Sequence, residues 1–280
     1  MSGPSSGAAI ARSFRFLRDV RGWRRIAQRI GGRSGAFVVE NDGIRFAGDM
    51  ASFVDRQIYL FGDYERENIR LFLQACPKRG VILDIGANAG THSLAFARAF
   101  DKVHAFEPNA LLWEQFCRNM ALNEARNVEL HRIGLSDVSA ELQLYDVDND
   151  NQALGTFATI EQYDLPLTPL AKARVEIFDD YLPDLGVDAV KIDVQGLEPN
   201  VLRGMRRMLA RDRPVVWAEF GSATLSEVAT RAQLRALFPY EVAIRRFEGH
   251  SVGLVRKGVT LDPYAGEAIG LGDYVISPVA

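Results

Sequence analysis

The sequence predicts an α/β fold, in which helices cover both faces of a doubly wound, mostly parallel, seven-stranded sheet. Three observations predict it. Strand and helix patterns alternate from Val81 to Leu237, a glycine-containing loop joins the first buried strand to its helix, and 48% of the 280 residues are apolar. A chain of this size and composition has enough apolar side chains for one large core.

The first 33 residues differ from the rest in charge, with eight arginines and a single acid, Asp19. The remainder has more acids than bases, which argues against nucleic acid as a partner. One helical stripe of apolar side chains is expected in this segment, formed by Phe16, Val20, Trp23, Ala27 and Ile30. We expect the stripe to pack on the protein's own core; peripheral membrane contact through residues 12–33 and a targeting segment stay open. Met1 to Gly7 is expected to lack structure.

The elements that follow are expected in a fixed order. A hairpin, Phe37–Glu40 with Ile44–Ala47, flanks the turn Asn41-Asp42-Gly43, and a helix spans Tyr64–Ala75. The first strand–helix units then comprise Val81–Ile85, Thr91–Phe100, Val103–Phe106, Asn109–Leu122 and Val128–Ile133.

An antiparallel excursion is expected next, because Glu141–Val147 and Thr156–Ile160 alternate apolar and polar residues around the acidic loop Asp146–Asn151. The remaining elements are a strand, a helix, a strand, a helix and a closing hairpin. They span Val187–Val194, Glu198–Arg211, Val215–Phe220, Leu225–Leu237, and Tyr240–Phe247 with Ser251–Val255. Residues 1–61 are predicted to be an N-terminal extension and residues 62–280 the main domain.

The location is expected to be cytoplasmic, with membrane association left open. The two cysteines, Cys76 and Cys117, follow no metal-ligand or disulfide spacing. No apolar run reaches the roughly 18 residues that a membrane span needs.

The glycine loop after Val81–Ile85 contains Gly86, Asn88 and Gly90. It departs from the G-x-G-x-x-G pattern of dinucleotide sites, because Asn88 occupies the second glycine position. Asp84, just before the loop, would repel a pyrophosphate and suit an ammonium group. An NAD-linked oxidoreductase is therefore disfavoured.

Two further strand ends favour S-adenosylmethionine as the cofactor. Glu107 ends the next strand, where a carboxylate can accept both ribose hydroxyls, and Ser136 and Asp137 follow the third strand, where an adenine edge would lie. The predicted cofactor-binding set is completed by neighbours of these residues and by Glu65. It comprises Glu65, Asp84, Gly86, Ala87, Asn88, Gly90, Glu107, Pro108, Asn109, Ser136, Asp137 and Asp193.

Between Gly62 and Phe220 the sequence resembles the FkbM-type methyltransferases. The resemblance lies in DIGANAGTHSLAFA, HAFEPN, IGLSD, KIDVQGLEPNVLRGM and PVVWAEF. It implies a Rossmann-like methyltransferase fold and S-adenosylmethionine-dependent O-methylation, typically of a sugar or polyketide hydroxyl. One departure from the family matters for the chemistry: Gln195 stands where the family usually has Glu.

Methyl transfer to a hydroxyl requires an aligned acceptor and removal of its proton. Asp193 is the main candidate for the acceptor side, helped by Lys191, Glu198 and Glu219, which end neighbouring strands or begin the next helix. These acids could also hold Mg²⁺, but Lys191 would compete for them, so Mg²⁺ is not favoured and no metal site is predicted. The expected acceptor is a glycan or another small molecule. A non-catalytic cofactor-binding or scaffold protein stays open because Gln195 cannot act as a base.

Overall fold

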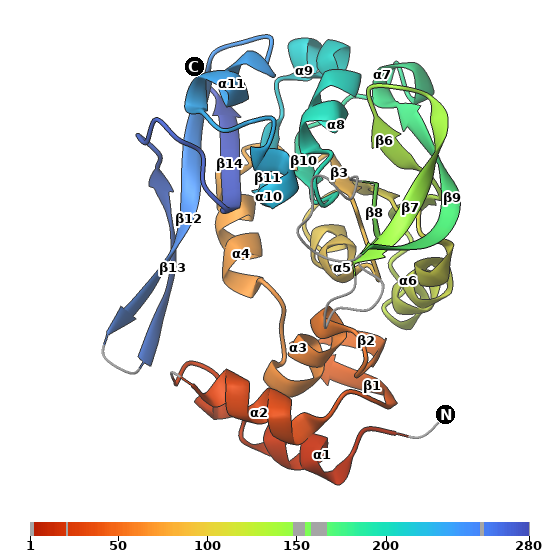
Figure 1. The fold of residues 1–280 in the computed structure, drawn as a ribbon, viewed down its shortest axis with the longest axis vertical. Helices are drawn as coiled ribbons and strands as arrows, with labels where there is room; N and C mark the ends of the chain where they lie inside the picture. Colours follow the sequence, from red (N-terminus) through yellow and green to blue (C-terminus); the bar gives the residue numbers. More distant parts are fainter. Residues whose placement is uncertain (1–2, 21, 148–154, 158–166, 253–254, 280) are drawn as a thin grey trace.

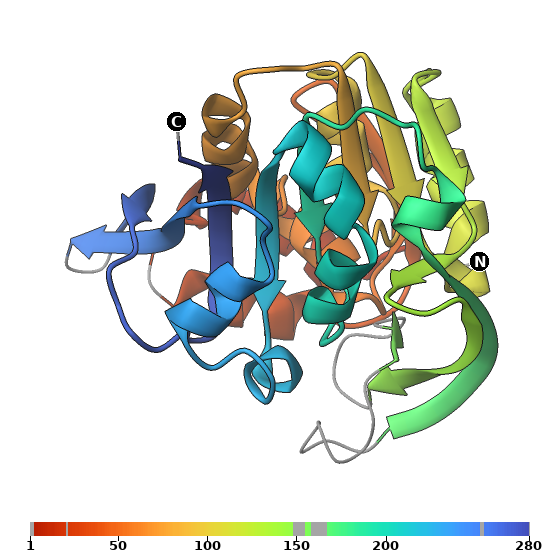
Figure 2. The same ribbon diagram turned by 90° about the horizontal axis from the view of Figure 1, so that it is seen from above.

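The computed structural model describes residues 3–20, 22–147, 155–157, 167–252 and 255–279. Within these ranges a central sheet lies between two helical layers, and the N-terminal elements pack against one of the layers (Figure 1). The C-terminal strands form one edge of the molecule and a smaller sheet lies at the other edge (Figure 2).

The central sheet of the described residues has eight strands in the order β13-β12-β14-β11-β10-β3-β4-β5. Five neighbours run parallel, namely β11 (Val215–Phe220), β10 (Ala189–Ile192), β3 (Val81–Ile85), β4 (Lys102–Phe106) and β5 (Val128–His131). Three are antiparallel, namely β14 (Gly272–Pro278), β12 (Val242–Val252) and β13 (Val255–Pro263). The predicted α/β class is confirmed, although the sheet is mixed and has eight strands in the described residues instead of the predicted seven. Strand order reverses between β3 and β10, which places a ligand cleft at their carboxyl ends.

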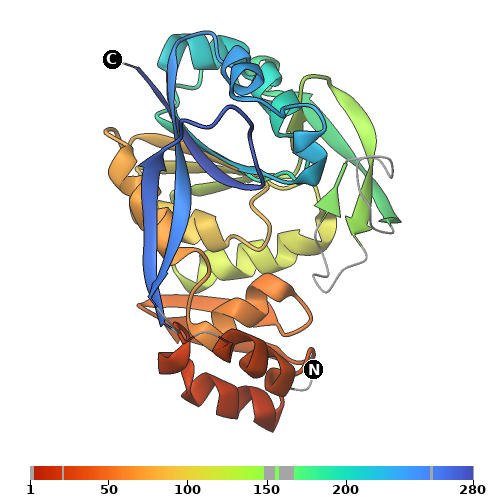
Figure 3. The ribbon, with the colours of Figure 1, turned by 60° about the vertical axis from the view of Figure 1, so that its left-hand side comes forward.

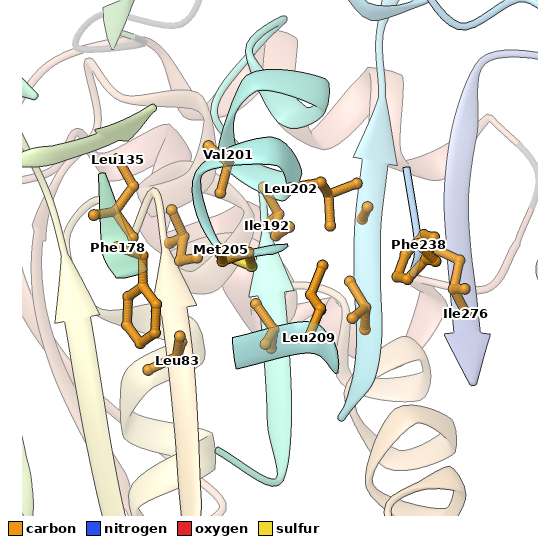
Figure 4. Packing of buried hydrophobic residues seen from close by; sticks show 14 of the residues in the cluster. Leu83, Leu135, Phe178, Ile192, Val201, Leu202, Met205, Leu209, Phe238 and Ile276 are labelled. Atoms are coloured by element: carbon orange, nitrogen blue, oxygen red, sulfur yellow. The ribbon is translucent and has the colours of Figure 1, made fainter. Parts of the chain in front are cut away.

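One face of the sheet is covered by helices from the second half of the chain. They are α7 (Phe178–Tyr181), α8 (Glu198–Gly204), α9 (Arg206–Asp212), α10 (Ser222–Leu225) and α11 (Arg231–Ala236). Figure 4 shows Leu202, Met205 and Leu209 packing against Leu83 and Ile192 of the strands. All five side chains are buried, so apolar burial holds this layer to the sheet.

The other face is covered by α4 (Arg66–Ala75), α5 (Thr91–Ala97) and α6 (Ala110–Leu122). Phe72 and Phe96 pack there with Trp217 of β11. The N-terminal layer packs on α5 and α6 through a second buried cluster. It comprises α1 (Ser6–Ser13), the 3₁₀ helix η1 (Arg15–Leu17), α2 (Trp23–Gly31), the hairpin β1 (Ala36–Asn41) with β2 (Ile44–Asp49), and α3 (Phe53–Phe61).

The smaller sheet has the order β6-β9-β7-β8 in the described residues. Its strands are β6 (Gly134–Ser136), β9 (Leu167–Ile177), β7 (Ala140–Val147) and β8 (Gly155–Thr156). The expected antiparallel pairing of β7 with the strand at Thr156 is present. Residues 148–154, with most of the predicted acidic loop, and residues 158–160 lie outside the described residues.

The N-terminal prediction was wrong in two respects. Ordered helix begins at Ser6, capped by the Ser5 hydroxyl, which accepts the Ala8 N–H at 3.1 Å. The single helix over the stripe is broken, because Gly22 adopts a left-handed φ of 86° before α2. Consequently Ala27 is buried whereas the Phe16 side chain is 71% exposed. No helix in the described ranges has both the length and the apolar character that a bilayer span needs.

Three later predictions were also wrong in detail. The helix expected over Glu198–Arg211 ends at Gly204, whose Cα faces the Ser136 carbonyl so closely that a Cβ would lie 2.0 Å from it. The helix expected over Leu225–Leu237 is two helices, because Thr230 and Gln233 form a capping box that starts α11. The closing hairpin extends further than expected, with Ser251 still in β12 and β13 continuing to Pro263. β14 was not predicted.

Candidate active site

A cavity of about 240 Å³ lies at the carboxyl ends of β3, β4, β10 and β11. Phe53 and Val54 of α3 line its opposite side, so the N-terminal layer contributes to the site. The boundary between an N-terminal extension (1–61) and the main domain (62–280) stays a prediction. Residues of α3, on the N-terminal side of this boundary, line the cavity of the main domain. The polar part of the lining includes Asn88, Glu107, Lys191, Asp193, Gln195 and Glu219.

The glycine loop forms the floor of the cavity. Gly86 has a φ of 80°, and a Cβ there would lie 1.8 Å from the Asp193 carbonyl oxygen, so only glycine fits. Its N–H and that of Ala87 donate to the Phe106 carbonyl. Asn88 takes a φ of 52°, which Asn tolerates better than most residues. The loop is therefore held close to the ends of both neighbouring strands.

Glu107 joins this loop to the start of α6. Its two carboxylate oxygens accept the N–H groups of Asn88 and Asn109, each at 2.8 Å. Burial raises the pKa of Glu107 to about 7, although both hydrogen bonds act to lower it. Each oxygen retains a free lone pair, so the carboxylate can still accept two hydroxyl groups from a ligand.

The buried Lys191 on β10 and the half-buried Asp193 just beyond it form an ion pair, with 3.2 Å between Lys191 Nζ and Asp193 Oδ2. Burial alone would lower the pKa of Lys191, but Asp193 and other carboxylates raise it overall. Burial alone would raise the pKa of Asp193, but Lys191 and the Gln195 amide, which donates to Oδ1 at 2.7 Å, lower it. Lys191 and Asp193 are therefore both charged at neutral pH.

Glu219 and Asp273 add two carboxylates to the same region. Asp193 is the main cause of the raised pKa of Glu219, followed by burial and Asp273. Burial is the main cause of the raised pKa of Asp273, and Trp217 Nε1 donates to its Oδ1 at 2.8 Å. Several ionised carboxylates near a single lysine would repel one another, so this part of the site retains protons at neutral pH.

Glu65 and His92 complete the titratable groups around the cavity. His92 Nε2 lies 3.1 Å from Glu65 Oε2. Burial lowers the pKa of His92 to about 4 and raises the pKa of Glu65 to about 7. His92 is therefore neutral at pH 7.

Eight of the predicted site residues line the cavity together: Gly86, Ala87, Asn88, Glu107, Pro108, Lys191, Asp193 and Glu219. Seven do not: Glu65, Asp84, Gly90, Asn109, Ser136, Asp137 and Glu198. Gly90 and Asn109 support the lining, since Gly90 lets the loop approach Met120 and Phe116, and Asn109 caps α6.

Asp84, Ser136 and Asp137 lie outside the cavity lining. The buried Asp84 accepts the Ser93 hydroxyl at 2.5 Å. Ser136 is part of β6, and Asp137 accepts hydrogen bonds from Asn200 and Arg203 of α8. Gly134 and Leu135, not Ser136 and Asp137, line the cavity at this strand end.

Glu198 faces away from the cavity, contrary to its expected acceptor role. Its carboxylate accepts the N–H groups of Val194 and Gly196 and the hydroxyl of Thr224, and only 1% of the residue is exposed. It holds the loop that carries Gln195, which has a left-handed φ of 56°. Glu198 is thus placed to position this loop rather than to touch a substrate.

The structure also places around the cavity several residues for which no role was predicted. Phe53, Tyr64 and Phe157 line it, and Asp273 lies opposite Glu219. The aromatic residues stood in segments that resembled ordinary helix or loop, and Asp273 belongs to a strand that was not predicted. The pairing of Trp217 with Asp273 had no local signal, because it joins residues that are far apart in the sequence.

Asp193, Glu198 and Glu219 do not gather around a common point that a metal ion could occupy. Among the described residues, the one group of three side chains with suitable spacing is His104, Glu129 and His131 on β4 and β5. There the two imidazoles are 2.9 Å apart, from His104 Nδ1 to His131 Nε2, which is a hydrogen-bond distance.

Comparison with known proteins identifies the family. Residues 84–246 match the family described as Methyltransferase FkbM domain. The chain is 29% identical over 185 residues to Methyltransferase sdnD of Sordaria araneosa, covering 55% of this chain and 69% of that protein. It is 28% identical over 145 residues to the Hexuronic acid methyltransferase AglP of Haloferax volcanii, covering 52% of this chain and 58% of that protein.

A solved structure is similar as well. The Methyltransferase FkbM from Methylobacillus flagellatus KT superposes with a TM-score of 0.43 at 16% identity, over 79% of this chain and 52% of that chain.

Proposed function

We propose that this chain, which belongs to the FkbM methyltransferase family, transfers a methyl group from S-adenosylmethionine to a hydroxyl of a carbohydrate or secondary metabolite. One observation carries the proposal: a single cavity joins the glycine loop and Glu107 to the ionisable side chains of Lys191, Asp193 and Glu219. The first set suits a nucleoside with ribose hydroxyls, and the second suits an acceptor that must lose a proton.

The cofactor side fits S-adenosylmethionine by the chemistry of its acceptors. Glu107 has one unused lone pair on each oxygen, which matches the two hydroxyls of a ribose. Gly86 lets the loop pass close to the Asp193 carbonyl, and Asn88 tolerates the left-handed φ that follows, so the loop lines the cavity where a ligand would approach. When bound, S-adenosylmethionine supplies a methyl group activated by its sulfonium.

The acceptor side is built to orient a hydroxyl and to take its proton. The ionised Asp193, held by Lys191 and Gln195, accepts a hydrogen bond from the acceptor hydroxyl and orients it. Glu219 lines the same cavity, and its raised pKa makes it a stronger base than an ordinary carboxylate once it is ionised. We therefore assign proton removal to Glu219 and orientation to Asp193.

A hydroxyl-rich acceptor is favoured because carboxylates are natural partners of polyols. The printed name of the Haloferax relative, a hexuronic acid methyltransferase, adds support for a sugar. Apolar wall residues, among them Phe53, Leu112 and Phe157, would shield the reacting groups from water.

The test is a calorimetric titration of the full chain with S-adenosylmethionine and S-adenosylhomocysteine, repeated with Glu107→Ala. Glu114→Ala, on the exposed side of the adjoining helix, is the matched control. Micromolar binding to wild type and to the control, lost in Glu107→Ala, is expected. Absence of binding to wild type would end the proposal.

Transfer itself is then measured as S-adenosylhomocysteine formed with uronic acids, neutral sugars and phosphorylated sugars as acceptors. Cofactor binding without turnover on any acceptor would favour the alternative, a cofactor-binding or scaffold protein that has lost catalysis. NADH binding that competes with S-adenosylmethionine would instead favour an oxidoreductase, which the family and Asn88 disfavour.

We also propose peripheral membrane contact through residues 12–33, because this arginine-rich segment exposes Phe16, Ile26 and Ile30. Vesicles containing phosphatidylserine should sediment the wild type more than Phe16→Ser/Ile26→Ser. Equal sedimentation of both proteins would contradict the contact. Variants of the whole chain are used because Ala27 and Gly31 of the same segment are buried in the fold.

A further inference from the structure

A second and larger cavity, of about 720 Å³, adjoins the candidate active site. Phe53 and Tyr64 line both cavities, so the two meet at these side chains. The larger cavity is enclosed by the N-terminal layer, the start of α4 and the long hairpin of β12 and β13. Figure 3 shows this hairpin reaching from the central sheet to the N-terminal helices.

Backbone contacts fix the hairpin to the N-terminal layer. The Arg256 N–H donates to the Asp19 carbonyl at 2.7 Å, and Val20 and Val255 form an isolated antiparallel bridge. These contacts join segments more than two hundred residues apart, as their numbers show. They place the basic side chains of β13 beside those of α2 in one wall of the cavity.

The charges of the cavity wall are divided by element. Glu65 at the start of α4 and Asp273 of β14 bring the carboxylates of the candidate active site to one part of the wall. Arg24 of α2 with Arg256 and Lys257 of β13 contributes three cations to another part, and the acids Asp19, Asp63 and Glu67 also line the wall. A ligand that spans the cavity would meet hydroxyl-binding carboxylates at one end and cations at the other.

These three cations differ from the other basic residues of the wall. Arg18, Arg66 and Arg70 are paired with Asp63, Asp42 and Glu67, at 2.9, 2.7 and 3.2 Å. Across the part of the chain that the structure describes, no carboxylate lies within 4.0 Å of Arg24, Arg256 or Lys257. Asp19 and Asp63 act on Arg24 only from a longer distance, so none of these three cations is held in an ion pair by a described carboxylate.

The Arg24 side chain is held in place by Phe61 and Gln57. Its guanidinium lies 4.8 Å from the centre of the Phe61 ring and donates to the Gln57 side-chain carbonyl at 3.2 Å. Burial lowers the pKa of Arg24 and the charge of Arg256 lowers it further, while Asp63 and Asp19 offset part of this effect. The two guanidinium groups thus repel each other, and a bound anion would relieve the repulsion.

We propose that Arg24, Arg256 and Lys257 bind a phosphate or pyrophosphate group carried by the acceptor. A guanidinium group can donate two parallel hydrogen bonds to phosphate oxygens, and Lys257 adds a third positive charge to those of the two arginines. The hydroxyl-bearing part of such an acceptor extends past Phe53 and Tyr64 toward Asp193 and Glu219. This assignment deepens the proposed function and rests on it only for the identity of the bound molecule as the acceptor.

The first experiment measures the anion site alone, by titrating inorganic pyrophosphate into the full chain without cofactor. Arg256→Gln and Lys257→Gln are compared with Arg70→Gln, which lines the same cavity but is paired with Glu67. Affinity should fall about tenfold in each of the first two variants and stay unchanged in Arg70→Gln. No binding to wild type, or an equal loss in Arg70→Gln, would overturn the site. An unchanged melting temperature in each variant shows that the fold is intact.

The second experiment tests the acceptor, by comparing a sugar phosphate with the same sugar lacking phosphate in the transfer assay. KM for the sugar phosphate should rise about tenfold in Arg256→Gln with kcat unchanged, and KM for the free sugar should not change. An equal effect on both sugars would overturn the acceptor assignment. If the chain binds pyrophosphate but transfers no methyl group, the anion site stands and the proposed function fails. The two experiments therefore test the two proposals separately.

A third arm separates a soluble phosphate from a lipid headgroup. Vesicles with phosphatidic acid are added to wild type and Arg256→Gln. Binding to vesicles that depends on Arg256, without binding of pyrophosphate, would overturn the acceptor assignment in favour of a headgroup.

Discussion

Glu219 of β11 and Asp273 of β14 are direct register partners across an antiparallel strand pair. Side chains opposite each other in such a pair lie on the same face of the sheet, so the two carboxylates face the same region. Like charges at this spacing repel, which is why the presence of Asp273 raises the pKa of Glu219 beyond the effects of Asp193 and burial. The antiparallel strand β14 therefore tunes a residue on the parallel half of the sheet.

Asp273→Asn is expected to shift the pH dependence of methyl transfer. The asparagine keeps an oxygen for the Trp217 N–H but removes the charge opposite Glu219. The pKa of Glu219 then falls, and a base is active only when ionised, so the rising limb of the kcat profile should move to lower pH by about one unit. Asp101→Asn, an exposed site before β4, is the control. A profile identical to the wild type would exclude Glu219 as the base.

Glu107 should make the free protein less stable as pH rises. Its pKa is 4.5 in a model peptide and about 7 in the folded protein, so the folded state binds the proton more tightly than the unfolded state. The stabilisation is complete below about pH 4.5 and is lost as pH rises through about 7, with a size of about 3 kcal/mol.

Urea unfolding of wild type and Glu107→Gln between pH 4.5 and 8 checks this linkage. Glutamine does not titrate, so the variant should gain stability relative to the wild type as pH rises. The comparison cancels the contributions of His92 and Glu65, which are present in both proteins. A difference in unfolding free energy that stays constant with pH would contradict the raised pKa.

Gly86→Ala should disrupt the cofactor loop. The added Cβ would lie 1.8 Å from the Asp193 carbonyl oxygen, and the left-handed φ of 80° adds roughly 1–2 kcal/mol of strain. Cofactor affinity should fall at least a hundredfold, and the melting temperature should fall as well. Gly186→Ala is the matched control, because a Cβ there meets no atom within 4 Å. Normal binding by Gly86→Ala would show that the loop can move away from Asp193.

The parts of the fold that local patterns specify were predictable. β3 and β11 have the predicted bounds because buried parallel strands form short apolar runs between polar loops. The helix breaks at Gly22 and at Met205 were missed, since apolar periodicity continues across both. At Gly204 the break accompanies close packing on Ser136, a long-range contact that no local pattern reveals.

The candidate site divides in the same way. Gly86, Glu107 and Asp193 follow strands that the sequence locates, so their convergence follows from the topology of a parallel sheet. Ser136 and Asp137 were displaced because residues 134–136 join the smaller sheet and its partner helix α8. Asp273 and Phe53 come from elements whose position depends on tertiary packing, and the sequence alone could not place them.

Gln195→Glu is expected to lower methyl transfer at neutral pH, even though it introduces the residue usual in the family. The Gln195 amide donates to Asp193 Oδ1 at 2.7 Å and helps keep that carboxylate ionised. A glutamate there loses the donor and adds a negative charge, so the pKa of Asp193 should rise and the two groups should share a proton near pH 7. Turnover should therefore fall several-fold, with cofactor affinity unchanged, and should recover at higher pH.

A rise in turnover would instead mean that Gln195 impairs catalysis in this chain, which would support the non-catalytic alternative. Gln143→Glu, which adds the same charge on β7 outside the cavity lining, separates this local effect from a general change in charge.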